Sequence, residues 1–221
     1  MSDPTAYTPT ARTVPTRSGD RASYDRALVH RVLDANWLCH LGFVRDGAPV
    51  VLPTLFARVG ERLYLHGSSA SRPVAGARGG ADGIAACVTV TQVDGVVLAR
   101  SAFHHSVNYH SVVVHGRARL VTDAAEKRAA LDAVVDHVVR GRAADSRPPT
   151  AKELAATGVL ALDLAEVSAK VRTGGPDDDA ADLGLPHWAG VLPVRGGYGA
   201  PVPSDDLADG TPLPAYLTPG G

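Results

Sequence analysis

The sequence predicts a mainly β fold, an antiparallel barrel with peripheral helices. Short apolar stretches that alternate with polar residues recur along the chain, and tight turns such as Asp46-Gly47 and Asp94-Gly95 join them. Helical patterns occur at irregular intervals, and this disfavours the regular strand–helix alternation of a parallel sheet. Apolar residues make up 45% of the 221 residues but aromatic residues only 5%. We therefore expect a large core built mostly from Val, Leu and Ala.

Composition also limits the possible partners and compartments. With 22 basic and 23 acidic residues, neither charge dominates, and we predict no nucleic-acid partner. Cys39 and Cys87 both lie in apolar, strand-like stretches and lack a Cys-x-x-Cys partner, so we expect reduced core residues rather than a disulfide or a zinc site. We find no signal-peptide pattern and no apolar stretch of about 18 residues. We therefore expect a cytoplasmic protein with no membrane partner.

In the first part of the chain, we expect an arm, a helix and a three-stranded meander. Residues 1–21 are rich in Thr, Pro, Ser and Arg and predict a flexible arm, or one that lies on a partner. Ser23-Tyr24-Asp25 caps a helix that runs to about Ala35. The predicted strands are Leu38–Val44, Pro49–Val59 and Arg62–His66.

The meander delivers the chain into the turn Gly67–Arg72, the feature around which the chain is organised. Its free backbone N–H groups, three serine hydroxyls and one guanidinium can converge on a phosphate. The alternative is an ordinary polar turn, in which Ser71 caps a short helix from Pro73 to about Arg78.

The rest of the chain continues the same pattern. The predicted strands are Ile84–Val93, Val96–Arg100, Val112–Val121 and Val159–Leu164, and Asp123 and Thr150 cap two helices. Gly116 inside a strand indicates a bulge or a close backbone approach. Beyond Gly174, Gly, Pro and Asp dominate apart from one apolar stretch, Leu185–Val194. We divide the chain into an arm (1–21), a barrel domain (22–173), and a C-terminal extension (174–221) that packs on the groove or on a partner subunit.

Four stretches, in this order and spacing, resemble a known family. They are PVVLPTLFAR, RLYLHGSSASR, TVTQVDGVVLARSAFHHSVNYHSVVVHGRARLV and SAKVRTGGPDDDAADLGLPHWAGVLPV. They resemble the pyridoxamine 5'-phosphate oxidase-like superfamily, and within it the flavin-nucleotide-binding and nitroimidazole-resistance-like split-barrel proteins. The similarity covers about Tyr24 to Val194. It implies a six-stranded antiparallel split barrel that forms a homodimer and holds one FMN in each of two grooves between the protomers.

The resemblance also implies which residues bind the cofactor. The strand end at His66 and the turn that follows would hold the FMN phosphate, and Val51–Leu55 would lie beside the flavin ring. Ser111 would lie near the phosphate or ribityl chain of the flavin shared with the other protomer. For other residues a structural role stays open: a buried Tyr109, ion pairs of Lys170 and Arg172 with Asp177–Asp179, or a Trp188 that pins the tail. The full predicted set is Pro53, Thr54, His66, Gly67, Ser68, Ser69, Ser71, Arg72, Tyr109, Ser111, Lys170, Arg172 and Trp188.

The function that this resemblance implies is an FMN-dependent oxidoreductase that acts on a small molecule in the groove. His104 and His105 are the candidate catalytic proton donors; alternatively, they are loop residues bonded to backbone. Pro73 stands where the classical oxidase has a second basic residue, so we do not predict vitamin B6 oxidation. No Gly-x-Gly-x-x-Gly is present, so any NAD(P)H would bind transiently.

Two alternatives use the same fold. One is a non-catalytic binder of a flavin, a deazaflavin, or a haem or other tetrapyrrole, in which the histidine-rich loop would meet the haem iron. The other is a structural dimeric module with an empty groove. No separate metal site is predicted, because no carboxylate or cysteine keeps ligand spacing with the two histidines.

Overall fold

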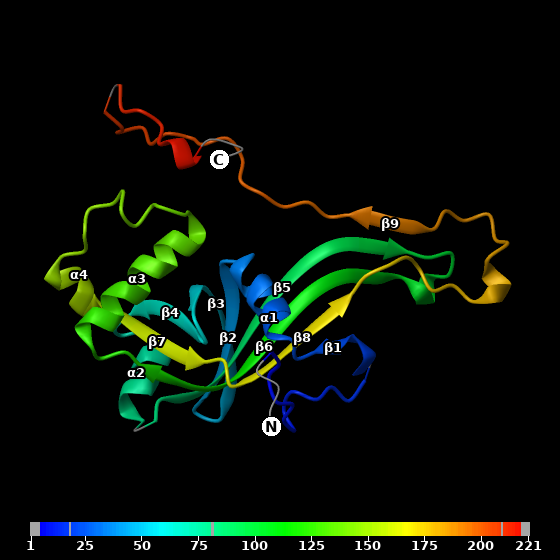
Figure 1. Ribbon diagram of the computed structural model, residues 1–221, viewed down its shortest axis with the longest axis horizontal. Helices are drawn as coiled ribbons and strands as arrows, with labels where there is room; N and C mark the ends of the chain where they lie inside the picture. The colour runs from blue at the N-terminus through cyan, green and yellow to red at the C-terminus, as the bar shows by residue number, and fades with distance from the viewer. Residues whose placement is uncertain (1–4, 18, 81, 209, 218–221) are drawn as a thin grey trace.

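Six antiparallel strands close into a barrel in the computed structural model, which describes residues 5–17, 19–80, 82–208 and 210–217 (Figure 1). The strands are β2 (Leu38–Arg45), β3 (Ala48–Val59), β4 (Arg62–Ser68), β5 (Ile84–Leu98), β6 (Ser106–Leu120) and β7 (Thr157–Asp163). Their order is β6-β7-β4-β3-β2-β5, and the pairing of β5 with β6 closes the ring. The predicted six-stranded antiparallel barrel is confirmed.

Three more strands extend the sheet outside the ring. β8 (Glu166–Arg172) pairs with β6, β1 (Ala22–Ser23) pairs with β8, and β9 (Gly190–Pro193) pairs with the far end of β5. The predicted turn at Asp94-Gly95 is wrong: the chain continues straight through it as one strand. Asp94 is the extra residue of a β-bulge between Val93 and Gly95, because β6 pairs with β5 on both sides of it. The β5–β6 hairpin therefore projects well beyond the barrel (Figure 1).

Four α-helices flank the barrel, and their starts follow the predicted caps. They are α1 (Arg26–Asp34), α2 (Arg72–Gly79), α3 (Ala124–Val138) and α4 (Ala151–Ala156). Asp25 and Asp123 each accept a hydrogen bond from the backbone N–H three residues on, and Thr150 forms a complete capping box with Glu153. Short 3₁₀ helices cover Gly19–Arg21, Ala102–His104, Ala180–Asp182 and Ala215–Leu217. None of the described helices is long and apolar enough to cross a membrane.

Two cores stabilise this arrangement. The larger fills the barrel, where Phe56, Leu63 and Val112 are fully buried. The smaller lies between the outer side of β4 and α3 and contains Tyr64 and Ala130. Both cysteines are free thiols; burial raises the pKa of Cys39 to about 12, because desolvation disfavours the thiolate.

Gly116 makes the close approach that was one of its two predicted roles. A Cβ atom at this position would lie 2.7 Å from Cδ1 of Leu162. The residue pairs with Ala86 in regular register, so the strand has no bulge there. The glycine is therefore needed because it packs closely against Leu162, and not because the strand bulges there.

Part of the predicted flexible arm is anchored on the barrel. Tyr7 is only 3% exposed, and its hydroxyl donates to Glu61 Oε2 at 2.9 Å. The guanidinium carbon of Arg26 lies 4.2 Å from the centre of the Tyr7 ring. One aromatic anchor thus holds a segment whose composition alone favours disorder; the predicted domain boundaries stay a prediction.

The C-terminal extension runs back from β9 towards α3 of the same chain (Figure 1). The Tyr198 hydroxyl donates to the carbonyl oxygen of Val138 at 2.6 Å. The Tyr216 hydroxyl donates to Asp145 Oδ2 at 2.5 Å and accepts from Arg142 Nη1 at 3.2 Å. These contacts bring the extension to the loop that follows α3.

Candidate functional site

The barrel splits where β3 and β4 diverge. Their pairing ends at Phe56 and Leu65, although both strands continue. Beyond that point they line a cavity of about 190 Å³, which we call the β3–β4 gap. The gap is lined by Leu41, Leu52, Pro53, Thr54, Leu65, His66, Gly67, Ser71, Pro73, Val74 and Leu160. Of the predicted cofactor residues, it brings together Pro53, Thr54, His66, Gly67 and Ser71.

Ser71 carries an unused hydroxyl in this gap. It occupies the N-cap position of α2, but its side chain makes no capping hydrogen bond. Its Oγ atom is buried and has no hydrogen-bond partner among the described residues. Leaving such a group unpaired costs about 1–3 kcal/mol, so a ligand atom is the expected partner. Gly67 allows this arrangement, because a Cβ there would lie 3.3 Å from the hydroxyl.

The rest of the predicted phosphate turn lies outside the gap. The Ser68 side chain accepts from the Ala70 N–H at 3.2 Å, and the Ser69 N–H donates to the carbonyl of Ala156 at 2.7 Å. Arg72 is exposed and lines another cavity of about 280 Å³, the Arg72 cavity. This cavity is lined by Phe43, Val44, Arg45, Asp46, Arg72, Ala75, Gly76 and Ile84. The two cavities lie on either side of the first turn of α2.

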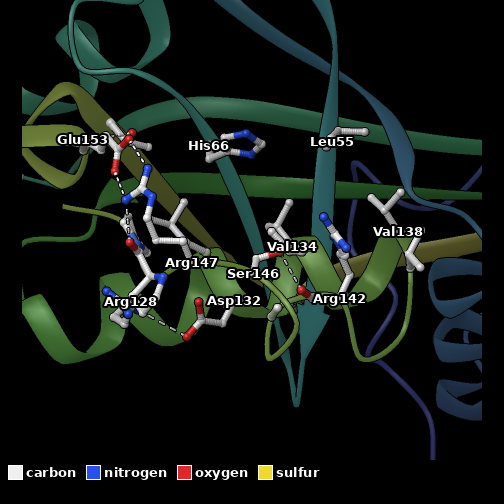
Figure 2. Close-up of a pocket in the computed structure, with 17 residues that line it drawn as sticks. Leu55, His66, Arg128, Asp132, Val134, Val138, Arg142, Ser146, Arg147 and Glu153 are labelled. Carbon is white, nitrogen blue, oxygen red and sulfur yellow. Dashed lines mark hydrogen bonds and ion pairs between the residues drawn. The ribbon is translucent and has the colours of Figure 1, made fainter. Parts of the chain in front are cut away.

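A larger cavity, of about 630 Å³, lies on the other side of His66; we call it the α3 cavity. Figure 2 shows it between α3 and the strands, with the His66 ring on the strand side. Its walls are mostly apolar and include Leu55, Leu131, Val134, Val135, Val138 and Val139. Val135 is 41% exposed, which is unusual for a helix face that packs on a sheet. The cavity leaves this apolar face partly uncovered.

His66 belongs to both cavities. Its Nδ1 atom is buried and has no hydrogen-bond partner among the described residues. Burial lowers the pKa of His66, because desolvation disfavours the charged imidazolium. A neutral imidazole with a free ring nitrogen is the form that binds metal ions and accepts protons.

Three arginines stand around the α3 cavity, and each is held by an acidic residue. Their ion pairs are Arg128–Asp132 at 3.5 Å, Arg142–Asp145 at 3.5 Å, and Arg147–Glu153 at 2.8 Å. Arg147 also fixes the state of its partner: its hydrogen bonds, with that from the Thr150 backbone, lower the pKa of Glu153 to about 2. The three ion pairs leave the rim of this apolar cavity without net charge, but their guanidinium groups can still donate to the acidic groups of a flat apolar ligand.

Four predicted residues meet elsewhere, on β6 and β8. Tyr109 is opposite Arg172, and Ser111 is opposite Lys170. Arg172 donates to the side-chain oxygen of Asn108 and to the carbonyl of Gly175. The ion pairs with Asp177–Asp179 that were the alternative for Lys170 and Arg172 are not formed. In the sheet, two strands separate β8 from β4.

The remaining predicted residues lie at the far end of the hairpin. His105 Nδ1 lies 3.1 Å from the carbonyl oxygen of Ser101, and His104 Nε2 lies 3.4 Å from Asp179 Oδ2. Trp188 is 68% exposed, with its ring against Gly190. None of the three lines the cavities described above. In the described part of the chain, no three His, Cys, Asp or Glu side chains gather as a metal site.

Residues 25–171, about two thirds of the chain, match the family model for pyridoxamine 5'-phosphate oxidase. The chain belongs to this family. The family and the fold predicted from the sequence are thereby confirmed. No relative was found among curated proteins.

Two solved structures resemble this family member over nearly its whole length. The flavocytochrome Anf3 from Azotobacter vinelandii is 41% identical, with a TM-score of 0.88, and the match covers 96% of this chain and 97% of that one. An FAD and haem binding protein from Mycobacterium smegmatis is 42% identical, with a TM-score of 0.83, over 89% and 95% of the two chains. A putative 5-nitroimidazole antibiotic resistance protein from Bacteroides thetaiotaomicron shares the fold, at 20% identity and a TM-score of 0.56, over 68% and 86%.

For this family member, reasoning from the sequence missed the α3 cavity. The apolar positions of α3 predicted core packing, because they recur at helical spacing. One signal was present. Ala130 and Leu131 are enough to cover β4, yet four more apolar positions follow them, Val134, Val135, Val138 and Val139. Arg142 and Arg147 follow in the loop, where nothing in the pattern marked them as lining a cavity.

Proposed function

We propose that this protein is a flavin-dependent oxidoreductase that also binds haem, with the flavin at the β3–β4 gap and the haem in the α3 cavity. The observation that carries the proposal is the position of His66, which lines both cavities and whose Nδ1 atom is buried without a hydrogen-bond partner among the described residues. The two relatives above 40% identity support it, since one is a flavocytochrome and the other binds FAD and haem.

The residues at the gap fit a flavin. Its polar groups need hydrogen-bond donors, and the unpartnered Ser71 Oγ supplies one for a phosphate beside the N-terminus of α2. Leu52–Leu55 provide an apolar edge beside the gap. Within this scheme, Thr54 and Gly67 position the ring and the phosphate chain.

The residues of the α3 cavity fit a haem better than the loop that contains His104 and His105 does. Haem needs a large apolar slot, an axial ligand and cations for its two carboxylates. The cavity offers about 630 Å³, the neutral His66 imidazole, and the three arginines on its rim. His104 and His105 are held by Asp179 and by backbone groups instead, and they line none of the cavities. We therefore assign the haem ligand to His66.

A bound flavin would supply hydride chemistry, and a bound haem one-electron chemistry. The chain's own part is to hold His66 neutral, to exclude water with the valines of α3, and to fix the arginines through their acidic partners. A small-molecule substrate, or a transiently bound NAD(P)H, would then reach the open face of the flavin.

For the flavin we propose FAD in place of the FMN predicted from the sequence. The M. smegmatis relative at 42% identity binds FAD. The β3–β4 gap, at about 190 Å³, also lies below the roughly 300 Å³ where ligand pockets usually begin. Either flavin must therefore extend beyond it.

We also propose that a second copy of this chain completes the flavin site. The outer face of β2 and β3 is apolar and open: Leu38 is 44% exposed, Val44 69% and Val51 63%. The predicted partners of the flavin on β6 and β8, such as Ser111 and Lys170, lie too far round the sheet to reach the gap of their own chain. A homodimer would cover the apolar face and bring the two halves together.

The test is the absorption spectrum of the purified protein, with mass identification of the released cofactors. We expect flavin bands in the near-UV and blue together with a Soret band. His66→Ala should remove the Soret band, and Ser71→Ala should weaken flavin binding several-fold. His104→Ala is the matched control and should change neither.

Other outcomes separate the alternatives. A Soret band that survives His66→Ala but is lost in His104→Ala or His105→Ala would return the haem to the hairpin loop. A protein that binds neither chromophore would contradict the whole proposal and favour a structural dimeric module.

A further inference from the structure

We infer that the Arg72 cavity is the binding site for the adenosine half of a flavin dinucleotide, and that Arg72 is the residue that selects FAD over FMN. The inference rests on the flavin site proposed above. It adds a subsite and a specificity residue that the flavin ring and its first phosphate do not require.

The Arg72 cavity and the β3–β4 gap adjoin the same turn of α2. Arg72, Ala75 and Gly76 follow one another at helical spacing and form one wall of this cavity. Ser71 and Pro73, on the other side of the same helical turn, line the β3–β4 gap. A ligand with a phosphate at the N-terminus of α2 therefore has a cavity on each side of that phosphate.

Each of the two cavities is too small for a whole dinucleotide. The gap holds about 190 Å³ and the Arg72 cavity about 280 Å³. Each is smaller than the roughly 300 Å³ of the smallest usual ligand pockets, so neither holds a whole dinucleotide. Together, the two cavities can hold one dinucleotide, with one end in each cavity.

The residues that line the Arg72 cavity suit a nucleotide. Arg72 is exposed, and no ion pair or hydrogen bond of its side chain occurs among the described residues, so its guanidinium is available for a second phosphate. Arg45 also lines the cavity and forms an ion pair at 3.2 Å with Asp46, whose side chain is 88% exposed. The charges of Arg45, Asp46 and Arg72 sum to +1. Ile84 and the exposed Val44 give the apolar surface that a purine needs.

Gly76 keeps the cavity open. A Cβ atom at this position would lie 3.0 Å from Cγ2 of Ile84, which is closer than most side chains tolerate. The glycine thus holds the helix close to β5 while leaving the space beside Arg72 free of a side chain.

The test compares riboflavin, FMN and FAD binding to the cofactor-free full-length protein, by quenching of flavin fluorescence. We expect wild type to bind FAD about tenfold or more tighter than FMN. Arg72→Ala should weaken FAD binding roughly tenfold to hundredfold, because a charge-assisted bond to phosphate is lost. Ala75→Leu, which fills the cavity, should weaken FAD binding by about tenfold but leave FMN binding unchanged.

Two matched variants act as controls. Arg31→Ala removes an exposed arginine of α1, and Ala129→Leu adds the same bulk to an exposed position of α3; neither residue lines a described cavity. Both should bind FAD and FMN like wild type. Equal affinity of wild type for FMN and FAD, or an Ala75→Leu variant with unchanged FAD affinity, would overturn the inference and leave the flavin site standing. Failure of all three flavins to bind would overturn the inference together with the proposed function.

Discussion

His66 shows how one residue takes its chemistry from its surroundings. On β4 it follows Leu65 in the barrel core and faces α3, as Tyr64 does two positions earlier. Burial lowers the pKa of its imidazole, and no described residue forms a hydrogen bond with its Nδ1 atom. The sequence identified the residue through its motif. His66 lies just beyond Leu65, where the pairing of β4 with β3 ends.

Gly116 gives a prediction for packing at a single site. Gly116→Ala places a Cβ atom 2.7 Å from Cδ1 of Leu162, a residue that is only 1% exposed. We expect a loss of about 1–3 kcal/mol in the free energy of unfolding, since the core cannot absorb the extra atom without strain. Chemical denaturation measures it. Gly19→Ala, which meets nothing within 4 Å, is the control and should be neutral. A Gly116→Ala protein as stable as wild type would contradict the close packing.

Asp178 gives a prediction for pH. Burial by itself would raise the pKa of Asp178, but hydrogen bonds from the Arg100 guanidinium and from the Ser101 and Arg100 backbone amides outweigh it and lower the pKa. The folded state then binds this proton less readily than the unfolded chain. Its stabilising effect is therefore complete above the ordinary aspartate pKa and is lost as the pH falls through the lower folded value.

The measurement is hydrogen exchange of the amides around Arg100 and Ser101 across the acid range. Wild type should lose protection there as the pH falls, and Asp178→Asn should show weak protection at every pH. Asp177→Asn changes an exposed neighbour and should behave like wild type. Equal acid sensitivity in wild type and Asp178→Asn would assign the effect to another group.

Among the elements, α4 depends on its cap more than the longer helices do. It has six residues, none of them buried, so packing stabilises it little. Thr150 accepts from the Glu153 N–H at 3.2 Å, and Glu153 accepts from the Thr150 N–H at 2.6 Å. Glu153 is also the partner of Arg147 on the rim of the α3 cavity. The cap therefore orders one edge of the proposed haem site.

We predict that Thr150→Ala costs about 1 kcal/mol, because one N-terminal amide loses its acceptor. The effect should be local. Hydrogen exchange of residues 151–156 should quicken, and the rest of the barrel should not change. Lys152→Ala, on the exposed side of the same helix, is the matched control. An unchanged exchange rate in α4 would mean that packing, not the cap, holds this helix.

For the whole molecule, the exposed face of β2 and β3 predicts self-association. Val51→Asp places a charge at the centre of this face, where Val51 pairs with Gly42. We expect the variant to elute as a monomer in size-exclusion chromatography with light scattering, while wild type elutes as a dimer, since an unpaired charge is costly in an interface. Val202→Asp changes a residue that is 90% exposed in the extension and should leave the dimer intact. A monomeric wild-type protein would contradict the proposed homodimer.

The sequence by itself determined the local features of this protein. The turn at Asp46-Gly47, the caps at Asp25, Asp123 and Thr150, and most strand positions follow from short-range preferences, and neighbouring residues settle them. The family motifs gave the barrel. The error at Asp94-Gly95 shows the limit, because a turn-forming pair became a bulge once β6 paired along its full length.

Only the tertiary structure decided where the candidate binding sites lie. Three features depend on contacts between segments far apart in the chain. They are the gap between β3 and β4, the uncovered face of α3, and the placement of Ser71 and Arg72 in different cavities. The same holds for the anchoring of Tyr7 by Glu61. Local propensity carries no information about such contacts, since the free energy that fixes them comes from burial and pairing across the whole barrel.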